Sequence, residues 1–235
     1  MKVFTAICTL ILISTTTFAQ VSEEEKQALL DLYVSTDGNN WNNTWDVNTP
    51  VKEWHGVTVE DNQVTGINLM FNNLKGQLPS SIGVLSHLKN MELSFNQIDG
   101  SLPVSLGKLE NLKSFAINSN RIKGSIPSSI GNLDQLEQLH LSSNLLSGAL
   151  PATLGDLTNL AVLNVFDNSL TGTIPFGLSE SENLTKLIVA ENDIIIADAL
   201  SDVLLFEVDN ENTRFITPTS FTNKTVLAIE TSDDN

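Results

Sequence analysis

The sequence predicts an α/β solenoid, a right-handed superhelix in which one short parallel strand per turn stacks on the next. Three observations predict it: a fixed internal period, an alternation of leucines within each unit, and turn residues that recur in register. No single unit can bury its own leucines, so the whole stack is expected to fold together. We expect a concave parallel sheet, a short second sheet and an N-terminal helical cap.

The internal period is 24 residues and runs through the middle of the chain. It is clearest in a column of asparagines, which are Asn72, Asn96, Asn120, Asn144, Asn168 and Asn192. Glycines from Gly76 to Gly172 and prolines from Pro79 to Pro175 keep the same step. So many columns in one register indicate about six copies of one structural unit.

Each unit has the pattern L-x-x-L-x-L-x-x-N-x-L, as in residues 136–146. Alternation through L-x-L predicts a short strand whose leucines point inward. The asparagine then turns the chain, and its amide can bond backbone groups that would otherwise be buried without partners. We therefore expect the asparagines of successive units to form a ladder. The glycine permits a tight turn, and the proline ends regular structure before an outer, convex segment.

This pattern resembles the plant-type leucine-rich repeat, whose consensus continues as L-x-G-x-[IL]-P after the asparagine turn. The matching segments are LKGQLP, IDGSLP, IKGSIP, LSGALP and LTGTIP. The resemblance covers roughly residues 56–192. It implies the curved solenoid with its small second sheet. It also implies an activity in recognition, because the family includes receptor ectodomains and inhibitors of cell-wall-degrading enzymes.

Residues 1–19 are predicted to be a signal peptide. Lys2 precedes an apolar run, and Thr17-Phe18-Ala19 supplies a cleavage site after Ala19. The apolar run is too short to cross a bilayer, which takes about 20 residues. We therefore expect no membrane insertion, and a location outside the cell, at its surface or in a bacterial periplasm.

Composition excludes several classes of function. Cys8 is the only cysteine and lies inside the predicted signal peptide. The remaining chain therefore has no disulfide, cysteine nucleophile or thiolate metal ligand. Removal of residues 1–19 leaves 11 basic and 28 acidic residues, a formal charge of −17. This charge argues against nucleic acid and anionic membranes as partners.

The predicted organisation continues with an N-terminal cap at 20–63, repeats at 64–192, and a C-terminal cap with an acidic tail at 193–235. Caps are needed because terminal leucines would otherwise face water. Ser22 and Glu25 form a capping box, which predicts the start of a helix.

The N-terminal cap carries three tryptophans, Trp41, Trp45 and Trp54. We interpret them as the core of the cap, and the alternative is a carbohydrate-binding platform. The element Trp54-x-Gly56-Val57 resembles the cap of plant-type repeat proteins, which normally carries two cysteines. Val59 stands where the second would be, which favours a microbial relative with a cysteine-free cap.

No catalytic, metal or cofactor site is predicted. The three histidines, His55, His87 and His140, fall in the cap, on the convex side and on the strand face, so they are not expected to meet. Asp167 and Glu191 share one column and could form a carboxylate pair for a hydrolase. Without a cleft, such a pair is more typical of a solvated acidic corner.

Function is expected on the concave face, where side chains between and after the leucines are not dictated by the repeat. The predicted partner-binding residues are Asn68, Met70, Phe71, Glu92, Ser94, Phe95, Asn118, His140, Asn164, Phe166 and Asp167. Phe71 and Phe95 are expected to lie side by side as interface anchors. The alternative is that Phe95 leans onto the asparagine turn and only packs there.

These features predict a non-enzymatic module that recognises a protein or peptide through its concave face. The alternative is binding of a glycan or cell-surface polysaccharide through the tryptophans and the Asn and Ser side chains. Ice binding, also known in the family, would need a flat and regular face, and these columns are irregular. The sequence leaves the oligomeric state open.

Overall fold

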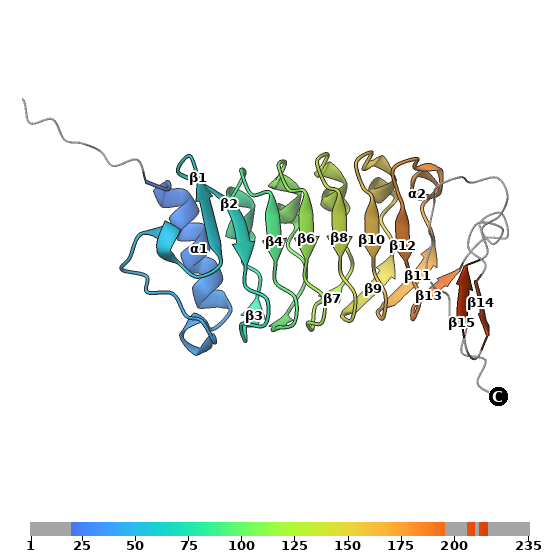
Figure 1. Cartoon of the computed structure of the whole chain (residues 1–235), viewed down its shortest axis with the longest axis horizontal. Coiled ribbons are helices and arrows are strands. Elements are labelled where there is room, and N and C mark those ends of the chain that lie inside the picture. The colour runs from blue at the N-terminus through green and yellow to red at the C-terminus, as the bar shows by residue number, and fades with distance from the viewer. Residues whose placement is uncertain (1–19, 196–205, 210–211, 216–235) are drawn as a thin grey trace, which may run out of the picture.

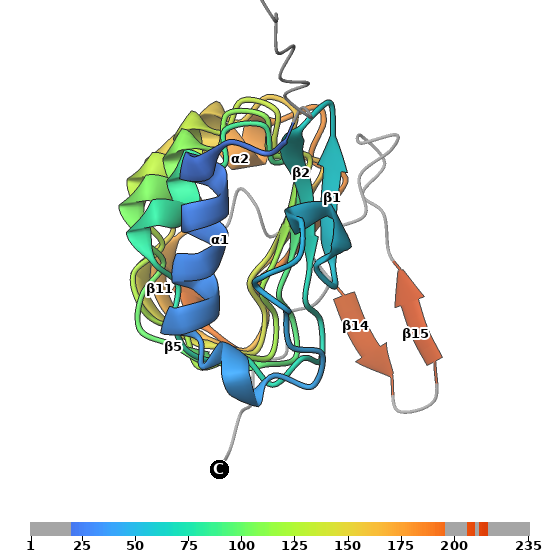
Figure 2. The ribbon, with the colours of Figure 1, turned by 90° about the vertical axis from the view of Figure 1, so that its left-hand side faces the viewer.

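Residues 20–195, 206–209 and 212–215 are described by the computed structural model of the chain. Residues 20–195 form one elongated stack of repeats with a helix at its N-terminal end (Figure 1). The main sheet makes one face of the stack, and short helical turns make the opposite face (Figure 2). The predicted solenoid, with a parallel main sheet and a short second sheet, is confirmed.

The N-terminal cap begins with helix α1, Glu23–Ser35. The Ser22 hydroxyl accepts a hydrogen bond from the Glu25 backbone N–H (3.2 Å), as the capping box predicts. One carboxylate oxygen of Glu25 accepts from the Ser22 hydroxyl (3.1 Å). The other accepts from the backbone N–H of Val64 (3.1 Å). The buried Glu25 side chain therefore links helix α1 to the main sheet by a hydrogen bond.

The three tryptophans are buried in the core of the cap, as predicted. Trp45 stacks on Trp54, with 4.8 Å between ring centroids, and meets Trp41 edge to face at 4.9 Å. Their indole N–H groups donate to the backbone carbonyls of Thr36, His55 and Thr49. The idea of a tryptophan platform for carbohydrate is therefore wrong, because the rings are covered by the cap.

The main sheet has seven strands in the order β1-β2-β4-β6-β8-β10-β12. They are β1 Val57–Glu60, β2 Gln63–Asn68, β4 Asn90–Glu92, β6 Ser114–Ala116, β8 Gln138–His140, β10 Val162–Asn164 and β12 Lys186–Ile188. β1 is antiparallel to β2, and every later pair is parallel. Paired residues of the parallel strands lie one repeat apart, such as Met91 and Phe115.

The second sheet follows the asparagine turns and forms two pieces, one of β3 and β5 and one in the order β13-β11-β9-β7. The strands are β3 Lys75–Gln77, β5 Gln97–Asp99, β7 Lys123–Gly124, β9 Leu145–Ala149, β11 Ser169–Thr173 and β13 Asp193–Ile195. Gly100 shows why glycine recurs here. Its φ is +76°, and a Cβ atom would lie 2.9 Å from the side chain of Gln77.

Short helices follow the proline column on the convex side. They are η3 Ser80–Val84, η4 Val104–Lys108, η5 Ser128–Asn132, η6 Ala152–Asp156 and α2 Phe176–Glu180, and the cap adds η1 Gly38–Asn40 and η2 Val51–Glu53. Each proline from Pro79 to Pro175 immediately precedes its helix. A Cβ atom at Gly107 would collide with the backbone carbonyl of Ser129. Successive convex turns therefore approach too closely for a side chain at this position.

The predicted asparagine ladder is confirmed. The Asn96 side-chain amide donates to the backbone carbonyls of Leu69 (2.9 Å) and Leu93 (2.8 Å). Its oxygen accepts from the backbone N–H groups of Asn72 and Leu74 (both 3.0 Å). Similar bonds are made by Asn120, Asn144, Asn168 and Asn192. The ladder thus satisfies backbone groups at the edge of a core filled by leucine and isoleucine.

Two predicted segments lie wholly or mainly outside the described residues. These are the signal peptide at 1–19 and the C-terminal cap and tail, of which β13 and the antiparallel pair β14 Phe206–Asp209 and β15 Asn212–Phe215 are described. Within the described ranges, no helix is long and apolar enough to cross a membrane.

Candidate partner-binding face

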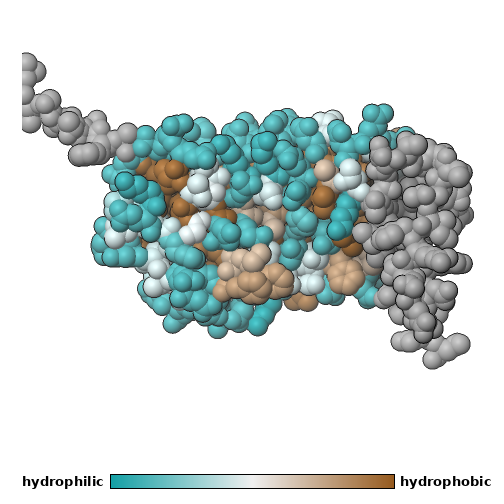
Figure 3. Space-filling view, in the orientation of Figure 1, coloured by the Kyte–Doolittle hydropathy of each residue, from teal (hydrophilic) through white to brown (hydrophobic). Residues whose placement is uncertain are grey.

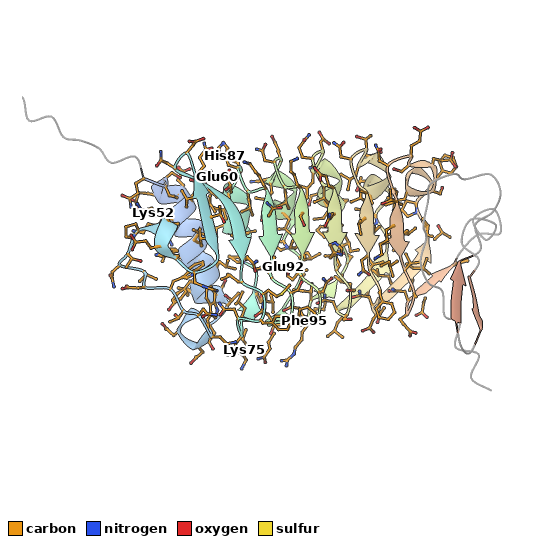
Figure 4. All side chains as sticks on the ribbon, in the orientation of Figure 1. Lys52, Glu60, Lys75, His87, Glu92 and Phe95 are labelled. Atoms are coloured by element: carbon orange, nitrogen blue, oxygen red, sulfur yellow. The ribbon has the colours of Figure 1, made fainter. Side chains whose placement is uncertain are left out.

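The sheet face carries the variable side chains of the strands and of the turns that follow them (Figure 4). Of the predicted residues, Asn68, Met70, Phe71, Phe95, Phe166 and Asp167 are exposed, while Glu92, Asn118, His140 and Asn164 are half-buried. Ser94 is buried, with 1% of its surface exposed.

Phe71 and Phe95 lie side by side, as predicted. Their rings are stacked, with 4.4 Å between centroids and 12° between planes. Phe71 is 60% and Phe95 is 45% exposed. A pale brown patch lies at the lower edge of the sheet face (Figure 3), where Figure 4 labels Phe95. Phe95 does lie at the asparagine turn, but nearly half of its surface remains available to a partner.

The backbone at both phenylalanines is left-handed, with φ of 55° at Phe71 and 58° at Phe95. The same conformation recurs in the column of residues before each asparagine, namely Ser119, Ser143, Asp167 and Glu191. It costs an L-residue about 1–2 kcal/mol, and bulky residues adopt it rarely. Stacking of the two rings stabilises the folded state by about 0.5–1.5 kcal/mol. Both rings nevertheless remain exposed in this conformation.

Beside the phenylalanines, polar side chains of the sheet face form a chain of hydrogen bonds that crosses the strands. The Ser94 N–H donates to the Glu92 carboxylate (2.8 Å), and the Asn118 N–H donates to the Ser94 hydroxyl (3.1 Å). The Ser142 N–H and hydroxyl both donate to the Asn118 side-chain oxygen (3.0 Å), and Asn164 donates to the Ser142 hydroxyl (3.4 Å). Buried Ser94 joins neighbouring repeats, so its predicted role as a contact residue is corrected.

One column of the sheet face was missed from the sequence. It lies two residues before the position inside L-x-L and comprises Asn90, Ser114, Gln138, Val162 and Lys186. Asn90 and Gln138 are exposed and the other three are half-buried. The signal was available, because residues two apart on a strand point to the same face.

His140 lies near the centre of the sheet face, in the same column as Glu92 and two strands from it. Burial lowers the pKa of His140 from its ordinary value of 6.5. The Glu92 carboxylate acts to raise this pKa, and the Lys186 ammonium acts to lower it. His87 lies at the opposite edge of the molecule from Phe95 (Figure 4). Within the described part of the chain, no group of three or more His, Cys, Asp or Glu side chains could hold a metal ion.

The proposed carboxylate pair lies towards the C-terminal end of the sheet face. Asp167 and Glu191 are both exposed, and the Asp167 N–H donates to the carbonyl of Ala190 (3.0 Å). The two acids thus occupy neighbouring repeats, as their shared column predicts. Their exposure agrees with a solvated acidic corner.

A pocket of about 280 Å³ opens beside the phenylalanine stack, and we call it the edge pocket. It is lined by Asn42, Phe71, Asn73, Phe95, Asn96 and Gln97. The Asn42 side-chain amide donates to the backbone carbonyl of Phe71 (2.8 Å). The N-terminal cap and the first two repeats therefore build this pocket together. Sequence reasoning missed it because Asn42 comes from the irregular part of the cap, where no period predicts its position.

Comparison with known sequences decides the family. A profile described as leucine-rich repeat region matches residues 67–204 of the chain. The chain belongs to the leucine-rich repeat family. No curated protein sequence matches this leucine-rich repeat protein.

Solved plant structures are similar to this leucine-rich repeat protein. The PEPR1–AtPEP1 structure is 28% identical, with a TM-score of 0.68 over 74% of this chain and 25% of that chain. The ectodomain of the receptor kinase SOBIR1 from Arabidopsis thaliana is 28% identical, with a TM-score of 0.67 over 76% of this chain and 98% of its own. The Arabidopsis HAESA ectodomain, in complex with an extended IDA peptide hormone, is 29% identical, with a TM-score of 0.66 over 73% of this chain and 29% of its own.

Proposed function

We propose that this leucine-rich repeat protein is a secreted, non-enzymatic module that binds a protein or peptide through its sheet face. The observation that carries the proposal is the exposed stack of Phe71 and Phe95. The similar HAESA ectodomain was solved with a peptide hormone, which supports a ligand of this class.

The size and layout of the sheet face support an interface of ordinary extent. Seven strands at a spacing of about 4.8 Å extend over roughly 30 Å, which is enough for a standard protein interface. Large aromatic side chains with polar neighbours are the usual anchors of such interfaces. Phe166, which is 37% exposed, offers a second anchor beside Asn164 and Asp167.

The proposal is tested by affinity capture with the chain from Gln20 onward, using cell material and medium of the source organism. The test variant replaces Phe71 and Phe95 with asparagine, which accepts the left-handed backbone. We expect captured partners to fall at least about tenfold, because hot-spot aromatics dominate binding. We expect the free energy of unfolding to change by less than about 1 kcal/mol, because relief of backbone strain offsets the lost stacking.

Ser143→Asn is the matched control, because Ser143 belongs to the same left-handed column (φ 52°) but lies two repeats from Phe95. It should capture the same partners as the wild-type chain. Retention of all partners by the double variant would refute the role of the phenylalanine stack, provided that both proteins are folded by circular dichroism.

A further inference from the structure

A relay of side chains runs along the edge pocket from repeat to repeat. The Arg121 guanidinium donates to the Gln97 side-chain oxygen (3.3 Å), and the Gln97 amide donates to the Asn73 side-chain oxygen (2.7 Å). The Asn73 amide donates in turn to the backbone carbonyl of Asn40 in the cap (2.8 Å). In each bond the donor belongs to the later residue and the acceptor lies nearer the N-terminal end of the stack. The Arg121 guanidinium is therefore held against Gln97, which lines the pocket.

The guanidinium at the end of this relay has no acidic partner in the described part of the chain. Only two salt bridges occur there, between Lys89 and Glu60 and between Lys113 and Glu137. Arg121 is exposed and uses one of its N–H groups for Gln97. A guanidinium has five such donors in a fork that matches a carboxylate, so it retains the geometry for a bidentate pair.

The surroundings of the edge pocket favour an anionic ligand in a chain whose formal charge is −16. Two more exposed cations, Lys75 and Lys123, lie on second-sheet strands of the same edge, with half-buried Asp99 between them in the sequence column. Figure 4 labels Lys75 and Phe95 at this lower edge. The residues that line the pocket are uncharged, so the positive charge for an acidic ligand comes from Arg121, bonded to the lining residue Gln97, and from the lysines along the same edge.

We propose that the edge pocket binds a protein segment in which an aromatic or large aliphatic side chain stands next to a carboxylate. This inference rests on the proposed function and names its partner's chemistry. The apolar side chain packs against the exposed surface of Phe95 and Phe71, and the carboxylate pairs with Arg121. The pocket holds about 280 Å³ and is largely open to solvent, so it suits one or two side chains of an extended segment rather than an enclosed small ligand.

The experiment selects a phage-displayed library of short random peptides on the immobilised chain and remakes the enriched peptides with a fluorescent label. Binding is measured by fluorescence anisotropy for the wild-type chain, Arg121→Gln, and Phe71→Asn with Phe95→Asn. Lys108→Gln is the charge-matched control, because Lys108 is exposed on the convex side in η4. Circular dichroism melting shows that each variant is folded.

We expect enriched peptides to carry Asp or Glu beside an aromatic or large aliphatic residue. Arg121→Gln and the double phenylalanine variant should each weaken binding at least about tenfold. Lys108→Gln should leave binding unchanged, and added salt should weaken the wild-type complex.

Other results would overturn the inference. Enriched peptides that are basic or uncharged would do so, as would an equal effect of Arg121→Gln and Lys108→Gln, or a library that yields no binder. If binding needs the phenylalanines but not Arg121, the acidic segment is wrong while the proposed function stands. A labelled uronic-acid oligosaccharide is the second probe, and tighter Arg121-dependent binding to it than to any peptide would reject a protein segment as the occupant. The proposed function is judged separately, by the capture experiment.

Discussion

Single residues on the sheet face divide into those fixed by the repeat and those left free by it. His140 belongs to the second group, since the equivalent position holds Glu92, Ala116 and Asn164 in other repeats. It is half-buried, and its burial opposes protonation in the native state. The residue therefore couples the stability of the stack to pH.

Replacement of His140 by glutamine should reduce the dependence of stability on pH. The native pKa lies below 6.5, so as pH falls the unfolded chain takes up the proton first. The free energy of unfolding of the wild-type chain should therefore decrease as pH falls through 6.5 and towards the native pKa. Above that window both states are neutral at His140, and this contribution to pH dependence vanishes.

Urea titrations of both proteins, at pH values from about 8 to about 5, measure the difference. As pH falls, the unfolding free energy of the wild-type chain should decrease more than that of the variant. A constant gap across this range would contradict the lowered pKa. Glu92→Gln is a useful companion, because removal of the carboxylate that raises the pKa should enlarge the effect.

For single residues, the sequence predicted correctly which side chains are neighbours. It did not predict their backbone conformation, burial or side-chain contacts. The spacing of 24 residues placed Phe71 beside Phe95. Their left-handed backbone and the burial of Ser94 depend on hydrogen bonds to the next repeat, which composition does not reveal. The contact of Arg121 with Gln97 depends on side-chain torsions, which are equally invisible in a repeat pattern.

Among the elements, the asparagine ladder holds each turn to the one before it. Asn96 reaches Leu69, in the preceding repeat, and also bonds the carbonyl of Leu93 within its own. These carbonyls, and the backbone N–H groups that donate to the Asn96 side-chain oxygen, belong to backbone that packs against the core. Loss of the side chain would leave several of them without a partner.

Asn96→Ala should lower the free energy of unfolding by about 1–3 kcal/mol, because buried backbone groups lose their hydrogen bonds. Urea denaturation followed by circular dichroism measures the change. Asn111→Ala is the control, since Asn111 is exposed in the turn after η4 and its side chain makes one hydrogen bond, to the carbonyl of Ser86. Equal effects of the two substitutions would count against the ladder as a source of stability.

The repeating elements followed from the sequence, but strand β1 did not. Its signal is the pair Asp61 and Asn62, which joins two alternating runs and adopts positive φ at both positions (49° and 64°). Such residues form tight two-residue turns between antiparallel strands. The pair lies just before the periodic region, so attention to the 24-residue register alone passes over it.

For the whole molecule, we expect the stability of the array to depend on its N-terminal cap. The tryptophan cluster closes one end of a continuous core that extends through the repeats. In a stack where each unit contacts only its neighbours, an open end exposes apolar surface and weakens the units beyond it.

Trp54→Ala should destabilise the complete chain by about 3–5 kcal/mol, because it leaves a cavity beside Trp45 in the buried cap. Thermal melting by circular dichroism should show a lower midpoint for the repeats as well as the cap. Val34→Ala is the control, because Val34 in α1 is 78% exposed. A second, unchanged transition for the repeats would show that cap and array unfold independently.

The fold of the repeats could be predicted because the same 24-residue unit recurs several times in the sequence. The partner could be predicted only as a class. In the binding mode proposed above, its identity would depend on the relative placement of a few side chains, such as Phe95 and Arg121, which lie on different repeats. Those positions vary freely within the repeat pattern, so the pattern that reveals the fold carries little information about the ligand.

The one-way bonding of the ladder also bears on how such a gene can change. Each ladder asparagine bonds only within its own repeat or to the one before, so a unit such as 97–120 could be copied or excised and the remaining repeats could form the same pattern of bonds. A copy inserted there would separate Phe95 from Arg121 by one further repeat, about 4.8 Å along the stack. The same event three units later would preserve their spacing and only lengthen the face. If Phe95 and Arg121 form the proposed site, replication slippage would change their separation in steps of one repeat.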